Sequence, residues 1–374
     1  MHLTKIKLAN FKNYEAVEVA FTPGINCVVG NNGVGKTNLL DAIYYLSFCK
    51  SCFNPFDAQN IRRGADFFAI HGNYDFDGQE IPVSCVFRQG SGKQVKFNKK
   101  SSTSFAEHIG RIPLVVVSPG DQVLILGGSD VRRKFIDGVI SQVDHGYLQA
   151  LLQYQKALDQ RNTLLKTFYE QRYFEEDSIA VWDEQLSRLG EPIHMARQLF
   201  VEELTPLFLS YFAEISQLPQ EKPSLHYVSQ LNEDTPMLQQ VRETHQRDAA
   251  VSYTTVGVHK DDLEFTIEDF PAKKFGSQGQ QKTFLLALKL AQYEYIRAHS
   301  GRVPILLLDD IFDKLDMLRV RQLLTLVGSD RFGQTFVTDT QPDRVREIFA
   351  TGDVAQRHQH RIFQAQDNKL RVDE

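Results

Sequence analysis

The chain lacks any long apolar run. The apolar runs it does have, such as residues 114–117 and 305–308, are far shorter than a membrane span, because a helix needs about 20 apolar residues to cross a bilayer. No apolar stretch follows the first lysines, so no signal peptide is visible. These absences argue against a membrane protein and lead us to expect a cytoplasmic protein without a membrane partner.

The composition also lacks a strong excess of one charge and an abundance of cysteine. A net charge of −5 excludes a wholly basic DNA-coating protein but allows a local basic face. Cys49 and Cys52 have C-x-x-C spacing, yet no further zinc ligands or thioredoxin-like context accompany them. We therefore expect neither a zinc site nor a redox site, and the length of 374 residues suggests two or three domains.

What the chain does contain is a complete phosphate-binding loop. Residues 30–37 read GNNGVGKT and fit the pattern G-x-x-x-x-G-K-[ST]. An apolar run at 24–29 predicts a buried strand before the loop, and residues 38–46 have helical spacing after it. This setting surrounds phosphates with N–H groups and a helix N-terminus. We predict an ATP site whose residues are Gly30, Asn31, Asn32, Gly33, Val34, Gly35, Lys36, Thr37 and Asn38.

A second apolar strand, residues 305–308, ends in Asp309 and Asp310, which is the Walker B pattern. We expect Lys36 to reach the β- and γ-phosphates and Thr37 to hold Mg²⁺ together with Asp309. Asp310 then lies where a general base can orient the attacking water. Lys36 and Asp309 are 309 − 36 = 273 residues apart, which favours an ATPase whose sheet is split along the sequence.

The chain has a β-rich beginning, a helical middle and an alternating end. Strands are predicted at 3–8, 17–21, 24–29, 67–76, 81–88, 93–98, 114–117, 224–231, 253–258, 263–268, 304–308, 334–338, 360–364 and 370–372. Helices are predicted within 129–218 and at 236–246, 277–299, 316–327 and 342–349. The pattern indicates an α/β ATPase lobe formed by 1–117 and 251–374, with an all-helical lobe, 118–250, inserted between them.

A polar segment, Ser277-Gln278-Gly279-Gln280-Gln281, begins the long predicted helix and can bind an anion. It resembles the signature motif of ABC-type ATPases, which binds the γ-phosphate of ATP held by a second subunit. The resemblance implies that Ser277, Gly279 and Gln280 contact nucleotide across a homodimer that forms in the ATP state.

Several motifs in order resemble the RecF family, DNA-repair ATPases related to SMC heads. Residues 8–14 resemble L-x-N-F-R-N-Y, residues 118–137 resemble S-P-E-D-L…G…R-R-R-F-L-D, and residues 257–263 resemble G-P-H-R-D-D-L. Residues 277–281 match S-Q-G-Q-Q. Departures include Val258 and Lys260 for Pro and Arg, and Gly120 for an acidic residue. The segment 338–340 stands where related ATPases often carry a switch histidine.

The resemblance implies a P-loop ATPase head of the ABC/SMC type with a helical lobe. Such proteins dimerise on ATP, bind duplex DNA at junctions with single-stranded gaps, and hydrolyse ATP slowly as a switch that DNA stimulates. They cooperate with RecR and RecO in loading RecA. With this resemblance, we also predict that Lys12 and Asn13 contact the nucleotide.

Candidate DNA contacts come from two basic clusters. Lys93, Lys96, Lys99 and Lys100 lie on a predicted strand and turn, and Arg132 and Arg133 lie on a predicted helix. Lysines can bind DNA phosphates whatever the base sequence, because such contacts need only charge. Two alternatives remain open. The lysines can keep a hairpin edge charged against aggregation, and the arginines can form structural ion pairs with the acidic insertion.

Two other functions stay open from the sequence. One is an ATPase subunit of a membrane transporter, which would need a surface for a membrane partner. The other is a nucleotide-gated protein scaffold without DNA contact. A helix of about 25 residues reaches only about 38 Å, so the insertion cannot form the long coiled-coil arm of full SMC proteins.

Overall fold

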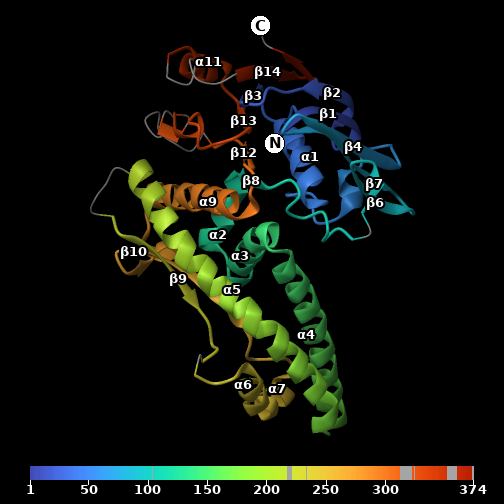
Figure 1. Cartoon of the computed structure of the whole chain (residues 1–374), viewed down its shortest axis with the longest axis vertical. Coiled ribbons are helices and arrows are strands. Elements are labelled where there is room, and N and C mark those ends of the chain that lie inside the picture. Colours follow the sequence, from blue (N-terminus) through green and yellow to red (C-terminus); the bar gives the residue numbers. More distant parts are fainter. Residues whose placement is uncertain are drawn as a thin grey trace. The chain divides into compact units, whose positions relative to one another are not determined.

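The computed structural model describes residues 1–102, 104–216, 221–232, 234–311, 322–323, 325–351 and 360–372. The chain divides into two compact units, which we call the first and second units (Figure 1). The first comprises Met1–Asp121, Glu214–Gln217 and Leu285–Glu374, and the second comprises Gln122–Ala213 and Leu218–Phe284. Residues 251–284, which the sequence pattern assigns to the ATPase lobe, therefore cluster with the second unit.

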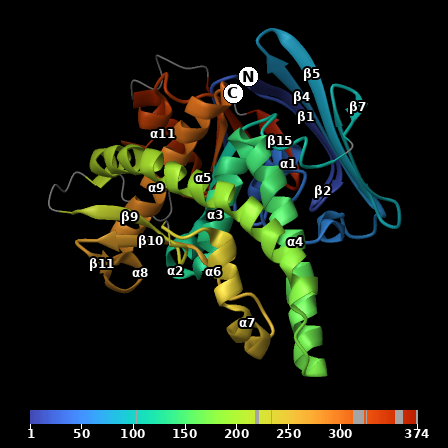
Figure 2. The same ribbon diagram turned by 60° about the horizontal axis from the view of Figure 1, so that its bottom comes forward.

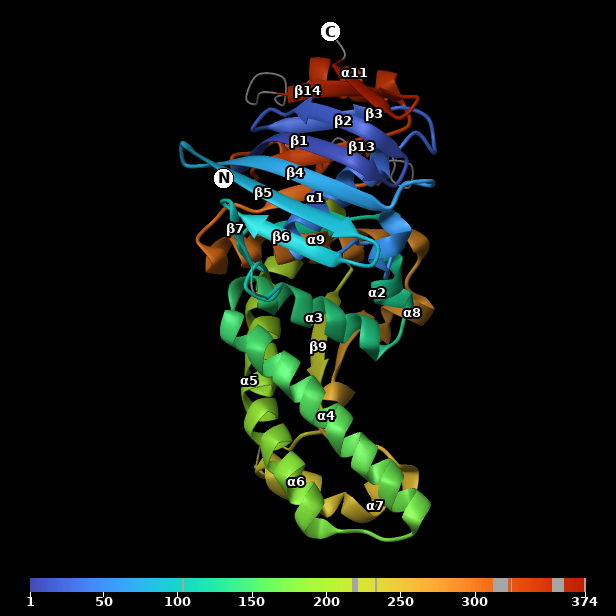
Figure 3. The same cartoon turned by 90° about the vertical axis from the view of Figure 1, so that its right-hand side faces the viewer.

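The first unit contains an antiparallel sheet with the strand order β2-β1-β4-β5-β6-β7 (Figure 3). Apolar and polar residues alternate along its strands, so one face is buried and packs on α1 (Lys36–Phe48). The strands are β1 His2–Phe11, β2 Tyr14–Ala20, β4 Phe67–Phe76, β5 Gln79–Arg88, β6 Gly92–Phe97 and β7 Lys100–Ser101.

A second six-stranded sheet of the first unit has the order β15-β14-β3-β13-β12-β8. Its strands are β3 Ile25–Val29, β8 Leu114–Val117, β12 Ile305–Leu308, β13 Thr335–Asp339, β14 His360–Gln366 and β15 Lys369–Val372. All neighbouring pairs are parallel except β14 with β15. Short, continuously apolar strands are typical of a sheet covered on both faces, and the parallel direction brings the ends of β3, β12 and β13 to one edge.

Gln334 ties the two sheets of the first unit together. Its side chain accepts a hydrogen bond from the Leu3 N–H at 2.7 Å and donates to the carbonyls of Leu3 at 2.7 Å and Thr22 at 2.8 Å. The residue is only 1% exposed, so these bonds satisfy an amide that water cannot reach. The start of β13 is thereby fixed to β1, across 331 residues of sequence.

The second unit is mainly helical (Figures 1 and 2). Its helices are α2 Val123–Leu126, α3 Ser129–Val143, α4 His145–Gln171, most of α5 Glu176–Ser216, α6 Met237–Glu243, α7 His245–Val251, α8 Ala272–Phe275 and the start of α9 Gln278–Ser300. A small sheet in the order β11-β10-β9 joins Phe270–Pro271, Asp262–Ile267 and Pro223–Val228. The first unit also contains α11 Pro342–Thr351.

Most of the predicted elements are confirmed within the described residues, but the strand at 253–258 is wrong. That segment is irregular and enters a 3₁₀ turn, η3 (Val258–Lys260). Distant side chains bind its backbone N–H groups: Asn162 accepts from the Thr254 N–H at 2.8 Å, and the buried Asp248 accepts from the Thr255 N–H at 3.0 Å. The predicted helix at 236–246 is two helices that meet at Thr244, and most of the one at 316–327 lies outside the described residues.

Candidate nucleotide-binding site

The predicted phosphate loop lies between β3 and α1, as the sequence requires. Its tip is open to solvent at Asn31, Asn32 and Gly33, whereas the Lys36 side chain is buried. Lys36 Nζ donates to the carbonyls of Gly30 at 2.8 Å and Asn31 at 3.1 Å. These bonds hold an ammonium group inside the loop, where phosphate oxygens can replace the two carbonyls.

Two glycines in the loop have no room for a side chain. At Gly30, whose φ is 153°, an added Cβ would lie 2.5 Å from the carbonyl oxygen of Ala365 on β14. At Gly35, whose φ is 107°, it would lie 2.4 Å from Nδ2 of Asn13. Glycine alone tolerates both the conformation and the close approach, so β14 and the β1–β2 turn form walls of the loop.

The carboxyl end of β12 brings Asp309 to the start of α1. Asp309 Oδ1 accepts hydrogen bonds from the Thr37 hydroxyl at 3.0 Å and the Thr338 hydroxyl at 2.8 Å. Burial raises the pKa of Asp309, the two hydroxyl bonds oppose this, and neighbouring Asp310 adds to it. A bound cation would favour the ionised carboxylate.

Thr37 and Asp309 together offer hard oxygen ligands, the type that Mg²⁺ prefers. Among the described residues, no group of three or more histidine, cysteine or acidic side chains could hold a metal. The pair Thr37 and Asp309 nevertheless fits Mg²⁺, because this ion is usually held by one or two carboxylates with waters and substrate phosphates. Asp310 follows at the strand end with a left-handed φ of 50°.

Thr338 is a site residue that the sequence analysis did not single out. It contacts Asp309 and also accepts the Asp310 N–H at 2.9 Å. A signal was present, since Thr338 ends a predicted strand and the carboxyl ends of parallel strands share one edge. From the sequence, this segment is identified only as the place where related ATPases often carry a switch histidine.

Asn13 braces the loop. Its Nδ2 donates to the Val34 carbonyl at 3.3 Å and to Asn368 Oδ1 at 2.5 Å, and its Oδ1 accepts from Asn38 Nδ2 at 2.7 Å. Tyr14 adds a bond from its hydroxyl to the Gly35 carbonyl at 3.0 Å. Asn13 and Asn38 thus contact each other and the loop, while their contact with nucleotide stays a prediction.

Lys12 pairs with a buried carboxylate of α1, and its contact with nucleotide stays a prediction. Lys12 Nζ lies 2.6 Å from Oδ2 of Asp41, and the two side chains are 11% and 0% exposed. The same carboxylate accepts the Ser51 hydroxyl at 2.6 Å and the Cys52 N–H at 2.7 Å. A buried carboxylate needs such partners. Lys12 therefore ties the β1–β2 turn to α1, and Asp41 holds the segment after that helix.

Ser277 begins α9 in the second unit and forms a reciprocal cap with Gln280. The Ser277 N–H donates to Gln280 Oε1 at 2.8 Å, and the Gln280 N–H donates to Ser277 Oγ at 3.2 Å. The first N–H groups of a helix have no partner within it. The N–H groups of Gln278 and Gly279 are thus left to face an anion.

Three of the predicted DNA contacts are engaged inside their own unit. Lys93 points to the inner face of the sheet and lies 2.8 Å from Asp57, and Arg132 makes two bonds to Asp262 at 2.6 and 2.8 Å. Arg133 donates to the Asp261 carbonyl at 2.7 Å. Lys93 and Arg132 thus form ion pairs within the chain, and their contact with DNA stays a prediction. Among the predicted lysines, Lys99 and Lys100 are exposed and Lys96 is half-buried.

The motif at residues 257–263 holds the second unit together. Asp261 is fully buried and accepts bonds from Arg197 at 2.8 Å, Tyr227 at 2.6 Å and Ser229 at 2.7 Å. His259 Nδ1 pairs with the Tyr154 hydroxyl at 2.8 Å, and burial lowers its pKa to about 4. The cluster therefore forms an internal network.

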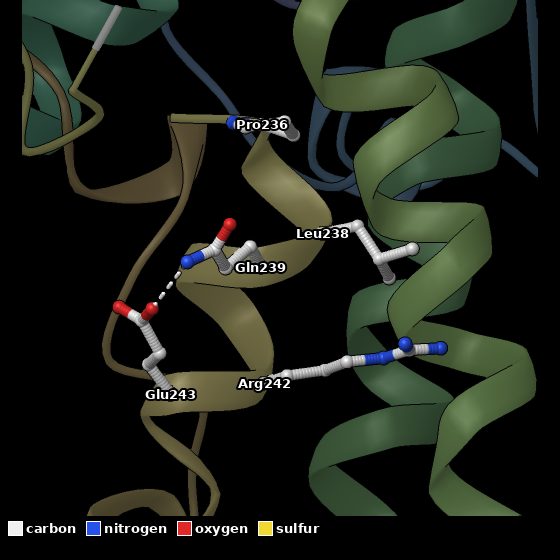
Figure 4. A pocket seen from close by; sticks show the side chains of 5 residues that line it. All are labelled: Pro236, Leu238, Gln239, Arg242 and Glu243. Carbon is white, nitrogen blue, oxygen red and sulfur yellow. Dashed lines mark hydrogen bonds between the residues drawn. The ribbon is translucent and has the colours of Figure 1, made fainter. Parts of the chain in front are cut away.

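A surface hollow of about 460 Å³ lies beside α6 (Figure 4). Its polar side chains are already paired, since Gln239 donates to Glu243 at 2.8 Å and Arg242 lies 3.7 Å from Glu184. The hollow shows no convergent set of polar groups of the kind that defines a ligand site.

Comparisons with known proteins agree with this geometry. The AAA ATPase domain family matches residues 1–185. A solved structure described as the recombination mediator protein RecF with ATP is 29% identical, has a TM-score of 0.88, and is matched over 100% of this chain and 98% of its own. An SMC head domain from Pyrococcus furiosus shares the fold with a TM-score of 0.56 at 18% identity, over 100% of this chain and 96% of its own.

The fold and the loop define a P-loop ATPase with a head of the RecF and SMC type. Curated relatives narrow this class. The DNA replication and repair protein RecF of Bacteroides thetaiotaomicron is 49% identical over 93% of both chains. The protein of the same name from Phocaeicola vulgatus is 47% identical over 99% of this chain and 98% of its own. The chain belongs to the RecF family. No helix in the described part of the chain is long and apolar enough to cross a membrane.

Proposed function

We propose that this chain is a cytoplasmic, ATP-dependent DNA-binding protein of recombinational repair and replication restart. It dimerises on ATP, binds duplex DNA at junctions with single-stranded gaps, and hydrolyses ATP slowly with stimulation by DNA. RecR- and RecO-type proteins are its partners in loading RecA. Near full-length similarity to DNA replication and repair proteins supports this proposal over a transporter subunit.

The observation that carries the proposal is the set of groups collected at the edge of the parallel sheet. Lys36 is held within the loop by two exchangeable carbonyl bonds, and Thr37 lies 3.0 Å from Asp309. Lys36 would contact the β- and γ-phosphates, and Thr37 and Asp309 would hold Mg²⁺. That ion would neutralise charge on the phosphates, and Asp310 would orient the attacking water.

A second copy completes the site in this proposal. The N–H groups at the start of α9, with Ser277, Gly279 and Gln280 around them, would bind the γ-phosphate of ATP held by the partner chain. The helix N-terminus supports this, because it combines open donors with a favourable dipole. ATP then links two chains, and hydrolysis releases them.

The test is a sizing run with and without ATP and a gapped duplex. We expect a monomer without ATP, a dimer with ATP, and a larger species when DNA is added. ATP-dependent dimers that never take up DNA at low salt would favour the scaffold alternative. A chain that stays monomeric with saturating ATP would contradict the proposal.

A further inference from the structure

The outer face of the antiparallel sheet carries one aligned row of hydrogen-bond donors. Strand pairing places Lys7 of β1 beside His71 of β4, His71 beside Ser84 of β5, and Ser84 beside Lys96 of β6. Residues flanking these positions on the strands are buried or, for Phe97, partly buried. By strand alternation the four side chains therefore share the face opposite α1, and Figure 3 shows the strands of this sheet side by side. We call these four residues the outer row.

The outer row is available to a ligand. Lys7 is 54% exposed and keeps an ion pair with Glu18 at 3.0 Å. Within the described part of the chain, the side chains of His71, Ser84 and Lys96 have no hydrogen-bond or ion-pair partner. The neighbouring row is formed by the small residues Ala9, Ala16 and Ala69 on β1, β2 and β4, and it continues through Val86 and Gln94 on β5 and β6. Only small side chains therefore flank Lys7 and His71 on this side.

We propose that the outer row binds the phosphates of duplex DNA, an inference that rests on the proposed function. Lysine, histidine and serine all donate to phosphate oxygens, and such contacts position a protein without reading bases. Lys7 and Lys96 are three strand spacings apart, roughly 14 Å, and the major groove of B-DNA is about 12 Å wide. The two ammonium groups can therefore contact the two strands that border one groove.

The surroundings of the outer row favour DNA over an acidic protein partner. The alanines beside the Lys7 end of the row offer no apolar or aromatic anchor of the kind that dominates most protein interfaces. At one end of the sheet, Asp75 pairs with Glu80, and both are carboxylates. DNA would be repelled there, which confines its path to the middle of the sheet. Lys93 is not part of the outer row, because its side chain lies on the inner face of the sheet, beside Asp57.

The test uses a plain duplex of about 25 base pairs and the full chain with ATP, with the dissociation constant measured across a salt series. Lys96→Gln should flatten the slope of log K against log salt by about 0.9, because one phosphate contact is lost. Ser84→Glu adds a negative charge at the centre of the row and should weaken binding at least ~10-fold. Lys96→Arg should bind like the unchanged chain.

Lys166→Gln is the matched control, since Lys166 is exposed on α4 in the second unit. ATP titration and thermal unfolding of each variant show whether it is folded. Unchanged salt slopes in folded Lys96→Gln and Ser84→Glu, with DNA bound normally, would overturn the outer row and leave the proposed function standing. If the unchanged chain binds no duplex with ATP, the proposed function fails together with the row.

Discussion

The nucleotide loop of the first unit and the buried network of the second unit use the same side-chain types in opposite ways. In the loop, Lys36 bonds only to two backbone carbonyls, which phosphate oxygens can replace. In the second unit, Arg161 is fully buried between Asp183 at 2.7 Å and Asp248 at 2.6 Å. A cation with exchangeable partners is ready for a ligand, whereas one fixed by two carboxylates is part of the framework.

The same contrast separates the motifs that resemble the RecF family. The loop at 30–37 lies where β3 ends and its tip is open to solvent, but Asp261 of the 257–263 motif binds Arg197, Tyr227 and Ser229. Resemblance alone does not distinguish these roles. The partners of each side chain do, and they assign the second motif to stability.

The largest effect should come from Arg161→Met in the second unit. The change leaves Asp183 and Asp248 buried without their main cation, and breaking a buried pair costs about 3–5 kcal/mol. Denaturant unfolding of the purified chain measures this loss. Arg188→Met, an exposed position on α5, is the matched control and should cost less than about 0.5 kcal/mol. Equal stability of the two variants would break the comparison.

Lys36→Met should lower ATP affinity by roughly 100-fold or more, because a buried charge-assisted contact with the phosphates is lost. Stability without nucleotide should change little, since the bonds lost involve only loop carbonyls. Direct titration with ATP measures the affinity, and Lys50→Met, at an exposed lysine just after α1, is the control. Near-normal affinity of Lys36→Met would refute the loop assignment.

His259 predicts an acid sensitivity of the second unit. Its Nε2 lies 3.0 Å from the Thr254 carbonyl and its Nδ1 accepts from Tyr154, so both ring nitrogens are satisfied when the ring is neutral. Its folded pKa, about 4, is below the unfolded value of 6.5. Its contribution is therefore complete above pH 6.5 and is lost as the pH falls towards 4, by about 2 kcal/mol at pH 5.

Unfolding experiments at pH 8 and pH 5 check this expectation. In His259→Gln, the difference between the two pH values should shrink by about 2 kcal/mol. A variant that loses as much stability on acidification as the unchanged chain would show that His259 is not the group responsible.

The smallest expected changes are in the affinity between two chains. They are tested with one variant in each unit, Asp310→Asn in the first and Ser277→Arg in the second. Asp310→Asn should keep ATP and Mg²⁺ binding, because Asp309 and Thr37 remain, and it should accumulate the ATP-bound dimer. Ser277→Arg should bind ATP normally yet weaken dimerisation by ~10-fold or more, since its side chain blocks the place of the partner's γ-phosphate. Light scattering with ATP distinguishes the two. The same response in both variants would overturn the shared site.

Much of the first unit follows from the sequence because its signals are local. The loop pattern and the alternation of β4 and β5 depend on neighbouring residues, and both are confirmed as elements. The pairings of the basic residues were not predictable in this way. Asp57 is 36 residues from Lys93, and Asp262 is 130 residues from Arg132, so only the folded chain shows that these cations are engaged.

The strand expected at 253–258 failed for a related reason. β-Branched and aromatic residues there favour a strand locally, but Asn162 and Asp248 bind its backbone groups. In a strand, these backbone N–H groups would bond to a neighbouring strand; here they bond to side chains that are distant in the sequence.

The position of β3 has a consequence for synthesis on the ribosome. Its two neighbours, β13 and β14, begin at Thr335 and His360, more than 300 residues after β3 ends. At about 5–20 residues per second, β3 would wait roughly 15–70 s for both partners. During that time the apolar strand β3 is exposed to solvent and the phosphate loop lacks its folded conformation. We therefore expect a chaperone that binds nascent chains to reduce aggregation of this protein. Nascent chains arrested before residue 335 should bind no ATP, and an ATP-protected fragment in limited proteolysis of such chains would refute this.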